Sequence, residues 1–222
     1  MEEKRRIESC TAVIKTFERP EKLQNLVDSI RGKYPSMPIL VANDSAMPTP
    51  VRGASSVWMP YDSGLAAGRN LLADLVETEY CLILDDDFLF VDGTDIGAMV
   101  GLLEDSPLDI LGGSLQTPSG GRASWQRVFY LHANRLYLKA TPYARLGCVN
   151  LVDICYNFFV ARPQTLRDVR WDEKLKLTEH TDFFLRAKAA GVLTGVCADI
   201  VVGHRPGNDS EVYRTHRRRG VF

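Results

Sequence analysis

Three consecutive aspartates are the densest group of chemically active side chains in the sequence. Asp85, Asp86 and Asp87 follow the apolar residues 81–84 and precede a second hydrophobic run, residues 88–90. Residues i and i+2 of an extended chain point to the same side, so Asp85 and Asp87 can converge on one divalent cation, or on a ribose and a cation together. A solvated acidic turn is the alternative, and the hydrophobic runs on both sides disfavour it.

Residues 64–70 form a second group, which suits the binding of an anion. The segment reads Gly-Leu-Ala-Ala-Gly-Arg-Asn at the start of a helix pattern, where backbone N–H groups and the helix dipole favour negative charge. The alternative is structural: small residues let a helix pack closely on a sheet, and Arg69 pairs with a surface carboxylate. Asp44, after the apolar residues 39–42, is likewise either a ligand-binding side chain or a turn former.

A third group opens the helix pattern of residues 179–190. Glu179 and Asp182 are three residues apart, which places them on one helical face, and His180 lies beside them. A side chain there can act as a general base, although acidic residues in a first helical turn can also simply cap the helix. His204, which ends an apolar run, is either a packed side chain or a ligand.

Alternating strand and helix patterns must position these groups. Helix patterns begin at Pro20, after Ser63 and at Thr94, the expected cap of its helix. Apolar runs between them indicate strands at residues 10–14, 39–42, 56–59, 80–84 and 108–111. This order favours a largely parallel sheet, and ligands collect at the carboxyl ends of such strands.

The second half of the chain is less regular. Residues 128–138 alternate as antiparallel strands do, and residues 151–161 form one strand-like run. The helix pattern that starts at Glu179 is closed by Gly191, and a last strand at residues 198–202 follows.

Composition narrows the functional classes. The 222 residues are 45% hydrophobic and carry a net charge of −1, which gives no general electrostatic case for a nucleic-acid partner. The five cysteines include no C-x-x-C pair, so we expect them to be reduced and mostly buried. The sequence as given shows no signal peptide and no transmembrane segment. We therefore expect a cytoplasmic protein, with peripheral membrane association and oligomeric state left open.

Taken in order, these motifs resemble the inverting glycosyltransferases of the GT-A fold, family 2 and its relatives. Residues 11–20 resemble that family's first strand and nucleotide loop, and residues 41–45 its second strand with a base-recognising Asp. Residues 64–70 resemble its G-x-x-x-x-R-N segment, residues 84–88 its D-x-D motif, and residues 179–186 its E-D-x-D-x-x-x-R helix. The catalytic domain of the ganglioside-type β-1,4-N-acetylgalactosaminyltransferases is also similar, at residues 59–60, 67–70, 85–88, 107–109, 149–150, 157–159 and 199–202.

The resemblance implies an α/β, Rossmann-like nucleotide-diphospho-sugar transferase fold, with a mixed, mainly parallel sheet flanked by helices. It implies metal-dependent, inverting transfer of a sugar from a UDP-sugar such as UDP-GalNAc, UDP-GlcNAc or UDP-Gal to a hydroxyl of a glycan or glycolipid. The implied donor-binding residues are Thr16, Phe17, Arg19, Asp44, Arg69, Asp85 and Asp86. The implied ligands of Mn²⁺ or Mg²⁺ are Asp87, Asp85 and His204.

On this basis we expect a single domain over residues 1–222. Its nucleotide-binding half covers about residues 8–114 and its acceptor and catalytic half about residues 115–204, followed by a basic tail at residues 205–222. The tail is expected to close over the donor as a lid. Aromatic side chains of the second half could stack on the acceptor sugar or pack in the core, namely Trp125, Tyr130, His132 and Tyr137.

One departure from the family pattern concerns the base. His180 stands where relatives carry the second acidic residue of the E-D pair, which leaves the base open among Asp182, Glu179 and His180, with the two carboxylates favoured. Two other functions remain. One is a non-catalytic nucleotide-sugar-binding relative, and the other is a D-x-D phosphatase, which Leu89 disfavours because that class expects Thr or Val there.

Overall fold

The computed structural model describes residues 1–133, 135–207 and 211–219, the last four of these by their backbone alone. The elements, in chain order, are α1 (Glu2–Glu8), β1 (Cys10–Thr16), α2 (Pro20–Lys33), β2 (Ile39–Asn43), β3 (Ser55–Trp58), α3 (Leu65–Leu75), β4 (Tyr80–Asp85), β5 (Phe88–Leu89), α4 (Ile96–Glu104), β6 (Ile110–Gln116), β7 (Arg122–Ala123), β8 (Val128–His132), β9 (Arg135–Lys139), β10 (Ala144–Leu146), β11 (Val149–Val152), β12 (Phe159–Ala161), α5 (Pro163–Val169), α6 (Glu179–Ala189), β13 (Thr194–His204) and α7 (Glu211–Arg219).

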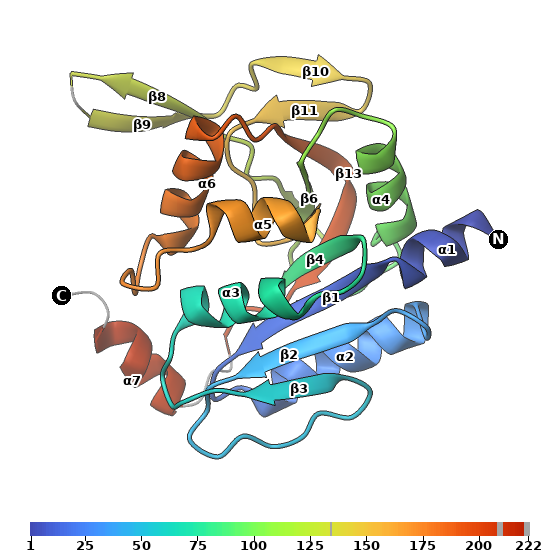
Figure 1. Ribbon diagram of the computed structural model, residues 1–222, viewed down its shortest axis with the longest axis vertical. Helices are drawn as coiled ribbons and strands as arrows, with labels where there is room; N and C mark the ends of the chain where they lie inside the picture. Colours follow the sequence, from blue (N-terminus) through green and yellow to red (C-terminus); the bar gives the residue numbers. More distant parts are fainter. Residues whose placement is uncertain (134, 208–210, 220–222) are drawn as a thin grey trace.

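One large mixed sheet runs through the molecule (Figure 1), in the order β10-β11-β13-β6-β12-β4-β1-β2-β3. In addition, β5 pairs with β13 and β7 pairs with β6. Strands β4, β1, β2 and β3 are parallel, as are β6 and β13. Between these two parallel parts, β12 runs antiparallel to both β4 and β6. The expected α/β sheet flanked by helices is confirmed, and its parallel pairing is concentrated in the first half of the chain.

Helices cover both faces of this sheet, so the central strands are apolar on both sides. In β1, Ala12 and Ile14 face the core shared with α1, α2 and α4, whereas Val13 faces the core shared with α3, α5 and α6. In β4, Leu82 and Ile83 divide between the two cores in the same way. Side chains of a strand alternate between faces, which is why these strands read as unbroken apolar runs.

The structure corrects several sequence-based expectations of element boundaries. Helices α1 and α5 were not predicted, and the run at residues 151–161 is two strands, β11 and β12, with different partners. The cap of α4 is Asp95, whose carboxylate accepts from the Ala98 N–H at 2.8 Å. Thr94 is instead buried, and its hydroxyl donates to the Val201 carbonyl at 2.7 Å.

The last strand and the tail also differ from expectation. Strand β13 begins at Thr194, four residues earlier than predicted, and the change of pairing register between Val196 and Val201 accommodates the polar Asp199 inside it. Within the tail, residues 211–219 form helix α7. The side chains of Arg217, Arg218 and Arg219 lie outside the described residues.

Two further observations concern the cysteines and the membrane-spanning potential of the helices. Four cysteines are buried, whereas Cys148 is exposed, with its Sγ 3.8 Å from the Sγ of Cys197. Among the helices within the described ranges, none combines the length and apolar character needed to cross a bilayer.

Candidate active site

The carboxyl ends of three neighbouring strands build one edge of the site. Strand register pairs Thr16 of β1 with Asn43 of β2, and Lys15 of β1 with Asp85 of β4. Because these strands are parallel, the segments that follow them emerge on the same side of the sheet. Residues 17–19, Asp44 and the three aspartates are thereby gathered from positions far apart in the chain.

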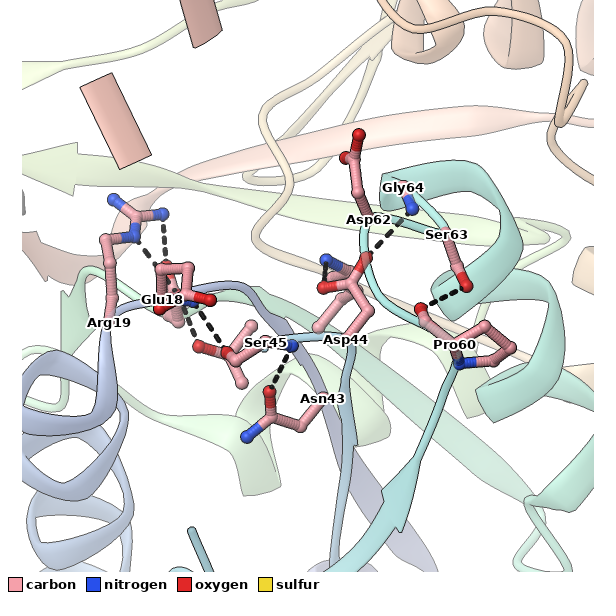
Figure 2. Close-up of polar contacts among 12 residues, drawn as sticks. Glu18, Arg19, Asn43, Asp44, Ser45, Pro60, Asp62, Ser63 and Gly64 are labelled. Atoms are coloured by element: carbon pink, nitrogen blue, oxygen red, sulfur yellow. Dashed lines mark hydrogen bonds and ion pairs between the residues drawn. The ribbon is translucent and has the colours of Figure 1, made fainter. Parts of the chain in front are cut away.

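Asp44 is buried at the end of β2 and holds the start of α3. Figure 2 shows its carboxylate between the β2 loop and Gly64, whose backbone N–H donates to Asp44 Oδ2 at 2.9 Å. The other carboxylate oxygen is ion-paired with the Lys15 ammonium, which is also buried. Burial lowers the pKa of Lys15, and the charge of Asp44 opposes that shift. Both carboxylate oxygens of Asp44 are therefore engaged by groups of the chain itself.

Lys15 was missed by the sequence analysis. Its signal is a single cation within the apolar β1, since a buried lysine requires a partner. Helix α3 passes directly over its stem: a Cβ added at Gly68 would lie 2.4 Å from Lys15 Cγ. The glycine of the G-x-x-x-x-R-N segment that precedes Arg69 is therefore required for close approach of α3 to the sheet.

The loops after β1 and β2 are joined into one rim. The Glu18 N–H donates to Ser45 Oγ at 2.7 Å, and the Ala46 N–H donates to the Glu18 carboxylate at 2.7 Å. The Ser45 N–H in turn donates to Asn43 Oδ1 at 2.9 Å. Figure 2 shows this network beside Arg19. These bonds fix the loop that carries Phe17 and Arg19.

The three aspartates point to different partners. Asp86 is buried, accepts from Thr16 Oγ1 at 2.7 Å and is ion-paired with Arg19. Burial raises the pKa of Asp86 to about 6, opposed first by the charge of Arg19. Asp86 therefore anchors the loop after β1 (residues 17–19) to the end of β4, whereas its neighbours Asp85 and Asp87 lie at the more exposed surface.

Asp85 and Asp87 have different partners at that surface. Asp85 accepts from Arg69 at 3.0 Å and from Asn157 Nδ2 at 3.1 Å. Asp87 lies 3.3 Å from Arg19 Nη1, and its carboxylate is 3.7 Å from His204 Nε2. Asn157 was also missed, because its contact with Asp85 joins residues 72 positions apart.

The donor set at Asp87 suits a hard divalent cation, although it is incomplete by itself. A carboxylate and an imidazole nitrogen are ordinary ligands of Mn²⁺. In the part of the chain whose side chains are described, no three His, Cys, Asp or Glu side chains approach as a metal-binding group. Asp87 and His204 can therefore supply two ligands, and the remaining ligands would have to come from bound substrate, solvent or a rearranged Asp85.

Arg69 joins the aspartates to helix α6. Its buried guanidinium lies 3.0 Å from Asp85 and 3.3 Å from the Glu179 carboxylate, and it stands over the Trp171 ring at 5.8 Å. The contact between Arg69 and Glu179, which are 110 positions apart in the sequence, thus brings Glu179 near Asp85. This link connects the two halves of the candidate site.

The other two candidate bases have different surroundings. Asp182 is held by Arg186, whose Nε and Nη2 donate to its carboxylate at 2.9 and 2.7 Å. His180 Nε2 lies 2.7 Å from the Cys155 carbonyl, and the ring stacks on Trp125 with centroids 5.7 Å apart. Burial, and then the charge of Arg69, lower the pKa of His180 to about 4. At neutral pH the imidazole is uncharged and donates its Nε2 proton to that carbonyl.

Replacing His180 by Gln should make folding stability less sensitive to acid. The pKa of His180 is depressed from 6.5 to about 4 in the folded chain. Its contribution to stability is therefore complete above pH 6.5 and is lost as the pH falls toward 4, because the unfolded chain binds the proton first. We expect the free energy of unfolding of the wild type to fall by on the order of 2 kcal/mol through this group between pH 6.5 and pH 4. This figure is smaller than the full pKa shift would give, because His180 is partly exposed. Urea unfolding near neutral pH and near the lower pKa measures this difference, and identical pH dependence in both proteins would refute it.

The C-terminal tail and the four aromatic residues expected on the acceptor side contact the candidate site only in part. The Arg205 N–H donates to the Asp87 carbonyl at 2.9 Å, and Arg19 stands over the Tyr213 ring of α7 at 4.1 Å. Of the four aromatic residues expected on the acceptor side, Trp125 lies against His180 of α6. The other three, Tyr130, His132 and Tyr137, lie on the β8–β9 hairpin and contact one another.

Known proteins resemble this chain in sequence. It is 35% identical over 206 residues to beta-1,4 N-acetylgalactosaminyltransferase 1 of Homo sapiens and 36% identical over 204 residues to beta-1,4 N-acetylgalactosaminyltransferase 2 of Mus musculus. These alignments cover 87% and 88% of this chain, but only 38% and 39% of the human and mouse proteins. The chain therefore spans well under half the length of these relatives.

The fold has counterparts among solved structures. The crystal structure of S. aureus TarS residues 1–349 superposes with a TM-score of 0.64 at 14% identity, over 88% of this chain and 60% of that one. A second crystal structure of TarS gives a TM-score of 0.66 at 16% identity, over 89% of this chain and 36% of that one. At such identities the likeness concerns the fold.

The family assignment rests on the sequence. The profile described as glycosyl transferase family 2 matches residues 11–170, which include β1 with its loop, Asp44, Arg69, the three aspartates and Asn157. The chain belongs to glycosyl transferase family 2.

Proposed function

We propose that this chain is a metal-dependent, inverting glycosyltransferase that moves N-acetylgalactosamine from UDP-GalNAc to a hydroxyl of a glycan or glycolipid. The names of the similar human and mouse proteins support the choice of sugar. The observation that carries the proposal is the Arg69 bridge, which brings Glu179 of α6 to Asp85 at the end of β4. A donor-binding edge and a candidate base then lie in one site of a family 2 chain.

The nucleotide would lie along the ends of β1 and β2. In this proposal Asp44 accepts the N–H of the uracil edge, and the rim that carries Phe17 borders the base. Thr16 donates to Asp86, and Asp86 holds Arg19, which faces the diphosphate; Asp85 faces the ribose beside Arg69. The short distances from Arg19 to Asp86 and Asp87 support this division, because a diphosphate arriving there meets a cation already positioned by buried hydrogen bonds.

Asp87 and His204, with Asp85 nearby, would hold Mn²⁺ or Mg²⁺ together with diphosphate oxygens. When bound, the cation would stabilise the negative charge that develops on the leaving diphosphate. The distance of 3.7 Å between the Asp87 carboxylate and His204 Nε2 supports this pairing of ligands. Asp85 remains a candidate third ligand, although in this structure it pairs with Arg69 and Asn157.

Glu179 is our candidate for the base that accepts the proton of the attacking hydroxyl. Asp182 is held by Arg186 on the same helix. His180 is engaged by the Cys155 carbonyl at Nε2, and its Nδ1 is buried, so neither ring nitrogen is open to an acceptor hydroxyl. Glu179 lies beside Arg69 and Asp85. A single displacement at the anomeric carbon, with the hydroxyl arriving opposite the diphosphate, inverts the configuration there.

Thermal unfolding with nucleotides tests this function. We expect UDP with Mn²⁺ to raise the melting temperature, and GDP, dTDP and CMP to raise it less, since a ligand of the folded state stabilises it. Asp44→Asn should weaken the UDP effect, whereas the exposed Asp92→Asn is the matched control. UDP-GalNAc turnover would then be followed with an oligosaccharide acceptor. Binding without turnover would favour the non-catalytic alternative, and no stabilisation by any nucleotide would contradict the proposal.

A further inference from the structure

The β8–β9 hairpin stands apart from the main sheet. Its five cross-strand pairs run from Val128 with Lys139 to His132 with Arg135. Figure 1 shows the hairpin extending beyond α6, away from the body of the molecule. All five residues of β9 are exposed, on both of its faces. An isolated two-stranded ribbon is marginally stable in water, so this one is suited to a partner.

Its two faces differ in chemistry. Because side chains alternate along a strand, the cross-strand pairs Phe129–Leu138 and Leu131–Leu136 share one face. That face is entirely apolar. The opposite face carries the pair Tyr130–Tyr137 and, on either side of it, His132, Arg135 and Lys139. The Lys139 ammonium stands over the Tyr130 ring at 4.1 Å, and the Tyr130 and Tyr137 rings are 6.4 Å apart.

The apolar face is open to solvent except at its root. Phe129 is buried in the core with α6, whereas Leu131 is 70% exposed and Leu136 and Leu138 are each 42% exposed. Scattered exposed leucines are ordinary, but three on one face of a projecting ribbon form a patch that marks an interaction surface.

The charge around the hairpin has one sign. Residues 110–152 contain four arginines and one lysine, and no aspartate or glutamate. The next acidic residue, Asp153, is buried and paired with Lys188 at 2.6 Å. A net charge of −1 for the whole chain makes this local excess notable. The hairpin is therefore matched to a surface that is both apolar and negatively charged.

We propose that the β8–β9 hairpin docks on an anionic lipid bilayer. The leucine face enters the boundary between head groups and acyl chains, while Tyr130 and Tyr137 occupy the head-group layer, where tyrosine is favoured. Arg135 and Lys139 extend their aliphatic stems along the ribbon and meet the phosphates of anionic lipids.

The backbone of the hairpin limits how deeply it can enter. In the described ranges, β8 and β9 pair as strands only with each other. Apart from the Phe129 N–H, which donates to Asp153 Oδ2 at 2.7 Å, the outer edge of each strand therefore presents N–H and carbonyl groups without a strand partner. Such groups are costly in hydrocarbon, which keeps the ribbon at the interface instead of spanning the bilayer. The occupant we commit to is therefore a lipid surface contacted at shallow depth.

Sedimentation with vesicles tests the proposal directly. The intact chain would be mixed with vesicles of phosphatidylcholine alone or with phosphatidylserine, and we expect it to bind the second kind preferentially, with binding that weakens as salt is added. The double substitution Leu136→Ser/Leu138→Ser should lower partitioning about tenfold. The matched control is Leu75→Ser at the end of α3, also 42% exposed, which should bind as the wild type does.

A second pair of substitutions separates charge from apolar burial. Arg135→Gln/Lys139→Gln should reduce binding to phosphatidylserine vesicles roughly tenfold and alter binding to neutral vesicles little. Circular dichroism would verify that each variant folds. Failure of the wild type to bind either kind of vesicle would overturn the proposal, as would binding unaffected by the leucine substitutions. A dimer in solution that these substitutions dissociate would also overturn it, since the face would then belong to a second copy.

This inference is independent of the proposed reaction. The assay contains no nucleotide, metal or sugar, so a chain that fails to bind UDP can still dock on lipid. Conversely, the hairpin variants retain every residue of the candidate active site, and nucleotide-induced stabilisation should be unchanged in them.

Discussion

Glu179→Gln is expected to lower kcat for sugar transfer by about 10²–10⁴-fold, because the amide retains the size of the side chain but cannot accept the proton of the acceptor hydroxyl. Donor binding should persist, since Gln keeps a carbonyl oxygen that can accept from Arg69, as the Glu179 carboxylate does at 3.3 Å. The measurements are steady-state turnover of UDP-GalNAc and the thermal shift with UDP.

Asp182→Asn is the matched control for that substitution. It removes a carboxylate from the same turn of α6, but one that is held by Arg186 instead of Arg69. We expect it to change turnover little and to alter stability modestly, as is usual for an ion pair that is partly exposed. If Asp182→Asn abolished turnover while Glu179→Gln preserved it, the base would be Asp182, and our assignment would be wrong.

Asp87→Asn is expected to remove the metal dependence of the reaction and to lower activity at saturating Mn²⁺ about 10³-fold. An amide is a weaker ligand than a carboxylate, and charge stabilisation of a leaving group by a cation contributes several kcal/mol. The side chain lies 3.7 Å from His204 Nε2, two residues beyond the end of β4 at Asp85.

Chelation distinguishes this effect from a general loss of structure. EDTA should inactivate the wild type reversibly and should have little further effect on Asp87→Asn. The exposed Asp92→Asn should behave as the wild type does. If UDP with Mn²⁺ raised the melting temperature of Asp87→Asn as much as that of the wild type, the Asp87 carboxylate would have no role at the metal.

The sequence predicted the strands that are buried on both faces, because burial imposes a continuous apolar run on them. Strand β4 is such a case. Helix α2, which begins at Pro20, was predicted for a different reason, namely the helical spacing of its apolar residues. The short helix α5 carries little periodic signal over its seven residues. The run at residues 151–161 was divided only by the structure, since both parts are apolar and their separate partners, β13 and β6, are remote in sequence.

The candidate site was predictable where its residues lie at strand ends or in a first helical turn. Asp44, Asp85 and Glu179 all do. What the sequence could not show is which side chains pair, because pairing depends on contacts across the fold. Lys15 and Asn157 belong to the site because they contact Asp44 and Asp85. Likewise, only the structure shows that Asp87 pairs with Arg19 whereas Asp85 pairs with Arg69.

The ion pair between Arg19 and Asp87 has a thermodynamic consequence for the proposed reaction. In the structure the Arg19 guanidinium is shared by Asp86 and Asp87, and Asp87 lies 3.3 Å from its Nη1. A diphosphate that engages Arg19 releases Asp87 from its partner, and a cation that engages Asp87 releases Arg19 in the same way. Each ligand therefore removes a cost that the other would otherwise meet, so nucleotide and metal should bind with positive cooperativity, and each should raise the affinity of the other by the same factor.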